Sequence, residues 1–169
     1  MYTNLLDLKY IFSKLDHYCI LKFDPKKCPK YTPNSDVDIL CKDKYITGNC
    51  IEEILNASGI KSKKYIAANN NLQIDAMNGN KLEIKFDITD DLSCFSKIKI
   101  KKELVKLILE NKIKYNSFFI PELKYDLAIR LLEYYENKNN PKKIKHLFYC
   151  NQFPINKKYA EEIIEKNKI

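Results

Sequence analysis

The stretch Pro33-Asn34-Ser35-Asp36-Val37-Asp38-Ile39-Leu40 decides the predicted fold and its site. Its apolar residues, continued by Cys41, predict a β-strand directly after a loop. Side chains two residues apart in a strand point to the same face, so Asp36 and Asp38 are expected side by side. Their carboxylates, roughly 6.5 Å apart, would repel by about 2–3 kcal/mol at an effective dielectric near 20. A divalent cation, Mg²⁺ or Mn²⁺, would reverse this repulsion, whereas the competing interpretation is a polar turn before a solvated strand end.

The residues before this stretch predict one helix and one short strand. Residues 3–15 place leucine, isoleucine and phenylalanine at helical spacing, with Thr3 as the expected N-cap. Residues 18–23 form an apolar run that predicts a strand. Three prolines follow within residues 25–33, so this segment is expected to be a loop.

The residues after the acidic stretch predict a helix over 47–58, a strand over 63–67 and a β-hairpin. The helix is expected to end at Gly59. Alternating runs over 72–77 and 81–88 flank Asn78-Gly79-Asn80, which predicts a hairpin with a three-residue loop. In that register Asp75 lies opposite Glu83, and Asp87 lies ~13 Å further along the sheet. The polar face of the hairpin would then carry Gln73, Asp75, Glu83, Lys85 and Asp87.

The remainder of the chain predicts helices. Helices are expected over 103–111, over 121–135 with Pro121 in the first helical position, over 142–150, and over 159–166. The fold class is therefore expected to be α+β, with a mixed sheet and a helical C-terminal part. We expect a core over residues 1–100 and a helical part over residues 101–169 packed on it.

The order of these elements resembles the nucleotidyltransferase-fold superfamily over roughly residues 16–90. The resemblance rests on the apolar strand at Tyr18-Cys19-Ile20-Leu21-Lys22, the motif Ser35-Asp36-Val37-Asp38-Ile39-Leu40 and the later run Leu72-Gln73-Ile74-Asp75-Ala76. More narrowly, it is similar to nucleotidyltransferase-like proteins of surface-polysaccharide gene clusters and large viruses, which share a hairpin motif seen here as Lys85-Phe86-Asp87-Ile88. The resemblance implies a nucleotidyltransferase-like core that transfers a nucleotidyl group from a nucleoside triphosphate to an unknown acceptor, with glycan biosynthesis as one expected setting.

The resemblance also implies roles for individual residues. Asp36 and Asp38 would hold Mg²⁺ on the nucleotide phosphates, next to Ser35. A third carboxylate would complete the site: Asp75 matches the general superfamily pattern, Asp87 matches the narrower hairpin motif, and Lys85 neighbours both. In the predicted register the two lie too far apart to share one metal ion. The third carboxylate would also accept the proton of the acceptor hydroxyl.

One departure from the family concerns the phosphates. Typical members carry a Gly-Ser pair about ten residues before the two aspartates, whereas this chain has Lys22-Phe23-Asp24-Pro25. Lys22, or the loop lysines 26, 27 and 30, could supply positive charge in its place. Without the Gly-Ser pair, a catalytically degenerate binding or scaffold protein of the same fold is the second hypothesis.

A second cluster of candidate residues lies in the C-terminal part. Arg130 is the only arginine of the chain, and it precedes Glu133 by three residues. The pair is explained by a surface contact within one helix. The segments around it nevertheless resemble the C-terminal helices of the same narrow family, which implies phosphate or acceptor binding by Arg130, Lys145 and His146, with Glu133 and Lys143 nearby.

Composition restricts the other possibilities. The net charge is +8, from 30 basic and 22 acidic residues. A nucleic-acid binder would be expected to use several arginines, so this third hypothesis is not favoured. No apolar run reaches the ~18 residues that a membrane span needs, and no signal peptide is evident. The six cysteines lack metal-ligand spacing and are expected to be thiols in a reducing, cytoplasmic compartment. The sequence gives no oligomeric state.

Overall fold

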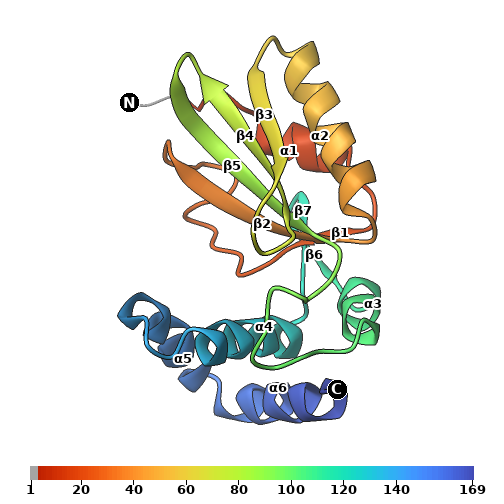
Figure 1. Cartoon of the computed structure of the whole chain (residues 1–169), viewed down its shortest axis with the longest axis vertical. Helices are drawn as coiled ribbons and strands as arrows, with labels where there is room; N and C mark the ends of the chain where they lie inside the picture. The colour runs from red at the N-terminus through yellow and green to blue at the C-terminus, as the bar shows by residue number, and fades with distance from the viewer. Residues whose placement is uncertain (1–3) are drawn as a thin grey trace.

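A mixed β-sheet with a group of helices below it makes up the chain (Figure 1). The computed structural model describes residues 4–169. The expected fold class, α+β with a mixed sheet and a helical C-terminal part, is confirmed. The elements are α1 (Leu8–Ser13), β1 (Tyr18–Ile20), β2 (Ser35–Cys41), α2 (Lys44–Ala57), β3 (Lys61–Ile66), β4 (Leu72–Asn78), β5 (Lys81–Thr89), α3 (Glu103–Glu110), β6 (Ile113–Tyr115), β7 (Phe118–Ile120), α4 (Leu123–Glu136), the 3₁₀ turn η1 (Pro141–Lys143), α5 (Ile144–Asn151) and α6 (Pro154–Asn167).

The main sheet of residues 4–169 has the strand order β1-β2-β5-β4-β3. β2 and β5 lie at its centre and are parallel, whereas the other neighbours are antiparallel. The hairpin strand β5 therefore adds to β2, although α2, β3 and β4 separate the two strands along the chain. This order places residues 35–40 directly beside residues 84–89.

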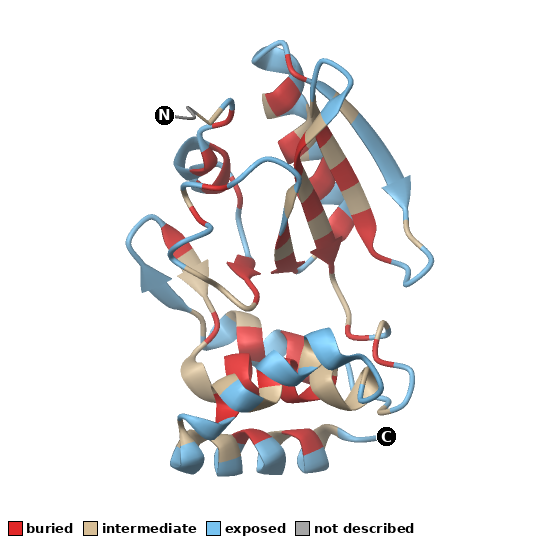
Figure 2. Ribbon diagram, turned by 90° about the vertical axis from the view of Figure 1, so that its left-hand side faces the viewer, coloured by how far each residue is buried: buried red, intermediate tan, exposed pale blue. Residues whose placement is uncertain are grey.

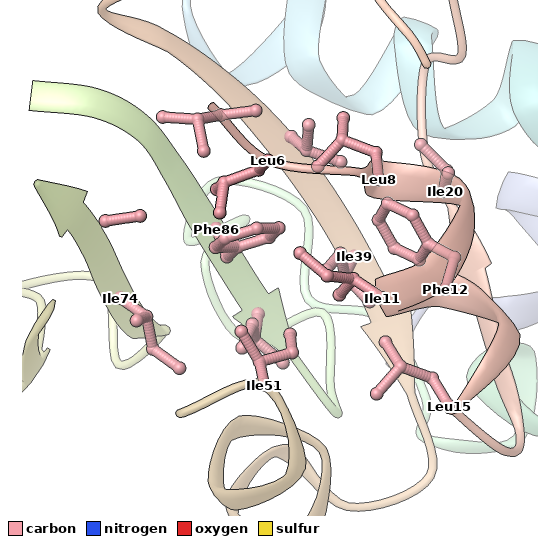
Figure 3. Packing of buried hydrophobic residues seen from close by; sticks show 14 of the residues in the cluster. Leu6, Leu8, Ile11, Phe12, Leu15, Ile20, Ile39, Ile51, Ile74 and Phe86 are labelled. Carbon is pink, nitrogen blue, oxygen red and sulfur yellow. The ribbon is translucent and has the colours of Figure 1, made fainter. Parts of the chain in front are cut away.

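One face of the sheet forms a hydrophobic core with α1 and α2. Val37 and Ile39 of β2 point into this core, as do Ile84 and Phe86 of β5. Figure 3 shows Ile39 beside Ile11 and Phe12 of α1, and Phe86, Ile74 and Ile51 of α2 belong to the same cluster. Because strand side chains alternate, Asp36 and Asp38 must lie on the opposite face.

The opposite face looks towards the C-terminal helices. α4 lies between the sheet and α6 (Figures 1 and 2), and Leu40 at the end of β2 joins a second hydrophobic cluster with α3, α4, α5 and α6. Residues 125–132 of α4 are all buried, as expected for a helix that is covered on both sides. The boundary expected near residue 100 stays a prediction, and Phe118 of β7 packs into the first core.

The register predicted for the hairpin is wrong. Asn78 pairs with Lys81, so the loop is Gly79-Asn80, with Gly79 at a φ of 61°. A bulge then shifts the register, so that Asp75 lies opposite Lys85 and not opposite Glu83. The bulge combines a tight turn with an unbroken apolar face, which is the physical reason for the difference.

The predicted position of Glu83 on the polar face is also wrong. It was expected on the polar face, but it is only 1% exposed. Its Oε1 accepts hydrogen bonds from the backbone N–H of Leu5 and the hydroxyl of Tyr31. The bulge turns Glu83 out of the strand alternation, and Leu5 before α1 and Tyr31 in the loop before β2 supply donors to it.

Several predicted boundaries differ from the structure. α1 begins at Leu8 because the Asp7 side chain caps it by accepting from the backbone N–H of Tyr10, whereas the expected N-cap Thr3 lies outside the described residues. α2 begins at Lys44 because Asp43 caps it. α4 begins at Leu123, so Pro121 precedes the helix and does not open it. α6 begins at Pro154, five residues before the predicted start.

The strands β6 and β7 form a small hairpin that the sequence analysis did not predict. β7 packs against β1, and Phe118 and Phe119 make edge-on ring contacts with Phe12 and Tyr18. This hairpin thereby connects the helical part to the end of β1.

All six cysteines of the described chain are thiols, four of them buried. Burial raises the pKa of the Cys19 thiol to about 12, consistent with a side chain that packs as an apolar group. No helix within residues 4–169 has the length and apolar character needed to cross a membrane.

Candidate functional site

The carboxylates of Asp36, Asp38 and Asp87 are placed by the two parallel central strands. Asp38 of β2 is the direct partner of Asp87 of β5, and Asp36 is the partner of Lys85. Neighbouring strands lie ~4.8 Å apart, so Asp38 and Asp87 stand next to each other on the face turned towards α4. All three aspartates line one pocket below the sheet.

Asp75 lies outside this group. It is on β4, so β5 separates it from β2. Its carboxylate is within 3.3–3.4 Å of the Tyr65 hydroxyl, and the Lys85 ammonium is 3.8 Å away. The hydroxyl donates to Asp75, and the carboxylate helps to raise the pKa of Lys85, after the larger effect of Tyr65. Asp75 and Lys85 thus form a separate polar contact beside the site.

Lys22 reaches into the acidic group from the loop after β1. Its Nζ lies 2.9 Å from Oδ2 of Asp38 and 3.8 Å from Oε2 of Glu133 on α4. Burial alone would lower the pKa of Lys22, but the carboxylates of Asp38 and Glu133 raise it to about 12. Lys22 is therefore a fixed ammonium between the sheet and the helices.

Glu133 has a second cation, Lys143 of η1, whose Nζ donates to Oε1. Burial would raise the pKa of Glu133, but Lys22 and Lys143 lower it below its usual value. Asp38, Lys22, Glu133 and Lys143 consequently form a chain of alternating charges across the space between β2 and η1.

Asp87 has a different environment. Its Oδ1 accepts from Nδ2 of Asn71 at 2.7 Å and its Oδ2 from Nε2 of Gln73 at 3.2 Å. Burial raises the pKa of Asp87, and the Asp38 carboxylate adds to this rise against the effect of the two amides. A carboxylate with a raised pKa accepts a proton more readily than an ordinary aspartate.

The donor set of Asp36, Asp38 and Asp87 fits a divalent cation in its chemistry, since Mg²⁺ prefers hard carboxylate oxygens. In the side-chain arrangement described for residues 4–169, no three such ligands converge on one point. Lys22 contacts Asp38, while the two amides hold Asp87. A cation bound to Asp38 would therefore have to displace the ammonium of Lys22.

The guanidinium of Arg130 is a positive charge of the C-terminal part that two side-chain contacts hold in place. Its Nε donates to Oδ2 of Asp126 at 2.6 Å, and its guanidinium lies 4.1 Å from the centre of the Tyr149 ring. The other oxygen of Asp126 accepts from the backbone N–H of Lys22 at 3.2 Å. Asp126 thus connects Arg130 to the loop after β1.

His146 lies beside Arg130 and is 5% exposed. No hydrogen-bond partner for its Nδ1 is present among residues 4–169. Burial, together with the positive charges of Lys22 and Arg130, lowers the pKa of His146 to about 4. The imidazole is therefore neutral at physiological pH.

These groups border one cleft with two halves. The first half, of about 550 Å³, is lined by six cationic side chains and three carboxylates: Lys22, Lys26, Lys27, Arg130, Lys143 and Lys145, with Asp24, Asp36 and Asp38. The second half, of about 430 Å³, is lined by five carboxylates and two lysines: Asp36, Asp38, Asp87, Glu133 and Glu136, with Lys22 and Lys143. Both halves share Lys22, Asp36, Asp38 and Lys143, so a cationic and an acidic compartment meet at these residues.

The cleft brings together the two candidate clusters of the sequence analysis. Asp36, Asp38, Lys22, Arg130, Lys145 and His146 line its cationic half, and Asp87 lines its acidic half. Ser35, Lys85 and Asp75 line neither half. Of the loop lysines, Lys30 also lies outside.

Three residues that position the site were missed. Asp126 could have been found from its helical spacing to Arg130, four residues on. Asn71 and Tyr149 carried no signal in the sequence, because their contacts to Asp87 and Arg130 depend on the tertiary fold.

No protein-family model and no curated protein matches the chain. The fold is similar to the crystal structure of the Megavirus polyadenylate synthase, with a TM-score of 0.39 and 12% sequence identity. The match covers 95% of this chain and 31% of that one, so the chain spans about a third of its length.

Proposed function

We propose that the cleft binds a nucleoside triphosphate and that the chain transfers its nucleotidyl group to an acceptor hydroxyl. The observation that carries this proposal is the meeting of the two compartments at Asp36 and Asp38. A polyphosphate needs positive charge, whereas activation of a hydroxyl needs a carboxylate that takes up a proton. The cleft offers both on opposite sides of one boundary.

The roles follow from this arrangement. The phosphates lie against the cationic half, with the α-phosphorus near the boundary. Asp87 accepts the proton of the acceptor hydroxyl, whose oxygen bonds to the α-phosphorus as the bond to the bridging β-phosphate oxygen breaks. Pyrophosphate leaves with that electron pair. Asp36, Asp38 and Asp87 would hold Mg²⁺, which supplies neutralisation of phosphate charge when bound.

Pyrophosphate release tests this proposal. Wild-type protein is incubated with each common nucleoside triphosphate, with and without Mg²⁺, and with sugar phosphates or RNA 3′ ends as acceptors. We expect Mg²⁺-dependent release with at least one pair, and a loss of at least about 100-fold in Asp38→Asn. Asp16→Asn, which alters an exposed carboxylate outside the cleft, is the matched control. Release that is unchanged in Asp38→Asn would refute the assignment.

A second candidate function is a nucleotide-binding protein without turnover. The observation that favours it is the contact of Lys22 with Asp38, which places an ammonium where a divalent cation would bind. In that case the wild type binds nucleotide but no divalent cation.

Electron paramagnetic resonance of free Mn²⁺ separates the two candidates. An active site requires Mn²⁺ binding by the wild type that is lost in Asp38→Asn. A degenerate site predicts no binding by the wild type but binding by Lys22→Met, in which the ammonium is removed.

A further inference from the structure

The chain between Glu136 and Glu161 carries positive charge and no negative charge. These 24 residues include η1, α5 and the first turns of α6, and they contain no aspartate or glutamate. Their six lysines are Lys138, Lys142, Lys143, Lys145, Lys157 and Lys158. Lys143 pairs with Glu133 and Lys157 with Glu161, and the other four have no ion pair within residues 4–169. This end of the helical part therefore presents positive charge that the described protein does not neutralise.

Exposed apolar side chains accompany these lysines. Phe148 of α5 is 59% exposed, and it is the one exposed phenylalanine among residues 4–169. Ile144, one helical turn before it, is 42% exposed, and Ile155 in the first turn of α6 is 70% exposed. Removing apolar side chains from water is favourable, so a group of them rimmed by polar residues indicates an interaction surface.

Helical geometry places these side chains on the outer side of the C-terminal part. The buried residues of α5 are His146 and Cys150, which lie on the side of the helix opposite Phe148. α6 begins three residues after α5 ends, and Nζ of Lys157 donates to Oδ1 of Asn151 at 2.8 Å. The start of α6 therefore adjoins the end of α5 (Figure 1). We call the exposed side chains of this corner the α5–α6 surface: Ile144, Lys145, Phe148, Ile155 and Lys158.

The combination of lysines and apolar side chains selects the kind of partner. Lysines close to a membrane are attracted to anionic lipid headgroups, and phenylalanine and isoleucine can enter the boundary between headgroups and acyl chains. A nucleic acid would neutralise the lysines but leave Phe148 and Ile155 in water. It would also be expected to contact arginines, which residues 137–160 lack. The surface therefore suits an anionic membrane better than a phosphate backbone.

We propose that the α5–α6 surface binds peripherally to a membrane that contains anionic lipids, with its apolar side chains inserted and its lysines against the headgroups. The binding is reversible, because a few inserted side chains and lysines supply much less free energy than a membrane-spanning helix. Lys145 also lines the cationic half of the cleft, so the bound membrane lies near the opening of the cleft. The inference rests on charge and exposure at two helices and not on nucleotidyl transfer.

Vesicle sedimentation tests this proposal with the full chain and without nucleotide. Phosphatidylcholine vesicles with and without added phosphatidylserine are compared at low ionic strength, and the bound fraction is then followed as salt is added. We expect the wild type to bind the vesicles that contain phosphatidylserine at least about tenfold more tightly than those without it, and to be released by salt.

Serine substitutions test the apolar contribution. Ile155→Ser and Phe148→Ser should each weaken vesicle binding by about fivefold or more, because serine gains nothing from insertion. Ile46→Ser is the matched control for Ile155→Ser, since Ile46 of α2 is also 70% exposed and lies outside the α5–α6 surface. It should leave vesicle binding unchanged. All three side chains are exposed, so the variants are expected to fold, and circular dichroism checks this.

A pair of lysine substitutions tests the charge. Lys145→Met combined with Lys158→Met should weaken binding by about tenfold, because both lysines belong to the α5–α6 surface. Lys61→Met combined with Lys63→Met removes the same charge from exposed positions of the edge strand β3. This control pair should change binding by less than about twofold, since its charges would be screened from the membrane.

Three results would overturn the proposal. These are no binding of the wild type to phosphatidylserine vesicles at low ionic strength, equal binding by Ile155→Ser and Ile46→Ser, and equal losses in the two lysine pairs, which would indicate attraction by net charge alone. Filter binding of polyuridylic acid examines the competing partner. Binding of this RNA that is tighter than vesicle binding and unaffected by Ile155→Ser would assign the lysines to a nucleic acid instead.

Discussion

Asp38 of β2 and Asp87 of β5 are direct partners in the parallel pairing of the two central strands. This pairing brings together two carboxylates that are 49 positions apart in the sequence. A slip of one residue in β5 would turn Asp87 into the hydrophobic core and Phe86 into the cleft, so the apolar face fixes the acidic one.

The first prediction distinguishes Asp87 from Asp75. Asp87→Asn should lower nucleotidyl transfer by about 100-fold or more, because it removes the proton acceptor beside Asp38. Asp75→Asn is the matched control, since Asp75 lies one strand further out and contacts Tyr65 and Lys85. Pyrophosphate release at saturating nucleotide measures both. A larger loss in Asp75→Asn would reverse the assignment.

The second prediction concerns the charge chain across the cleft. Lys22→Met leaves Asp38 and Glu133 without their shared ammonium, at side-chain exposures of 28% and 16%. Because these carboxylates are only partly solvated, we expect the free energy of unfolding to fall by about 1–3 kcal/mol at pH 7.

Urea denaturation of a double-mutant cycle checks this loss. Lys22→Met combined with Asp38→Asn should be less destabilising than the sum of the single changes, by about 0.5–3 kcal/mol. Additive effects would show that the contact between Lys22 and Asp38 does not stabilise the fold.

The third prediction is a pH dependence of stability from His146. Its folded pKa of about 4 lies below the ordinary value of 6.5. Above pH 6.5 the ring is neutral in both the folded and the unfolded state, and its contribution to stability is fully present. Between pH 6.5 and 4 only the unfolded chain takes up the proton, so stability falls, by up to about 3 kcal/mol.

The measurement compares the unfolding free energies of wild type and His146→Phe from pH 7.5 to pH 4. Carboxylates remote from His146 titrate alike in both proteins, so the difference between the curves reports the histidine and its coupling to Glu133. We expect the wild type to lose more stability on acidification, and parallel curves would contradict the depressed pKa.

The fourth prediction tests the buried carboxylate of the bulge. Tyr31→Phe removes the hydroxyl that donates to Glu83 at 2.8 Å and accepts from the backbone N–H of Leu6 at 3.0 Å. Because the lost hydrogen bond is to a buried carboxyl group, we expect a loss of about 1–3 kcal/mol in thermal or urea unfolding. Tyr10→Phe, at a ring that is 51% exposed, should change stability by less than about 0.5 kcal/mol. Equal effects of the two changes would exclude a stabilising role for the hydroxyl.

Much of the local structure could be predicted from the sequence because it depends on spacing. The alternation in residues 35–41 placed Asp36 and Asp38 on one face, and the helical spacing of apolar residues within 121–135 predicted α4. Helix ends were less accurate. At α1 and α2 an aspartate just before the helix caps it, whereas Thr3 was the expected N-cap of the first helix and none was assigned to the second.

The hairpin shows where local rules were insufficient. Its existence was predicted correctly, but the loop, the opposition of Asp75 to Glu83 and the exposure of Glu83 were not. A bulge shifts the pairing by one residue, and an alternating sequence pattern does not indicate where such a shift occurs. The predicted distance of ~13 Å between Asp75 and Asp87 was wrong for this reason.

The sequence by itself determined which side chains share a face, because neighbours along one strand or helix are fixed by backbone geometry. Only the tertiary structure decided that β5, and not β4, lies beside β2, that Lys22 reaches Asp38, and that Arg130 and His146 border the same cleft. These contacts join segments far apart in the chain. Their positions depend on how two hydrophobic clusters pack against the two faces of one sheet. That packing is the sum of many weak contacts between distant residues, so no short sequence motif predicts it.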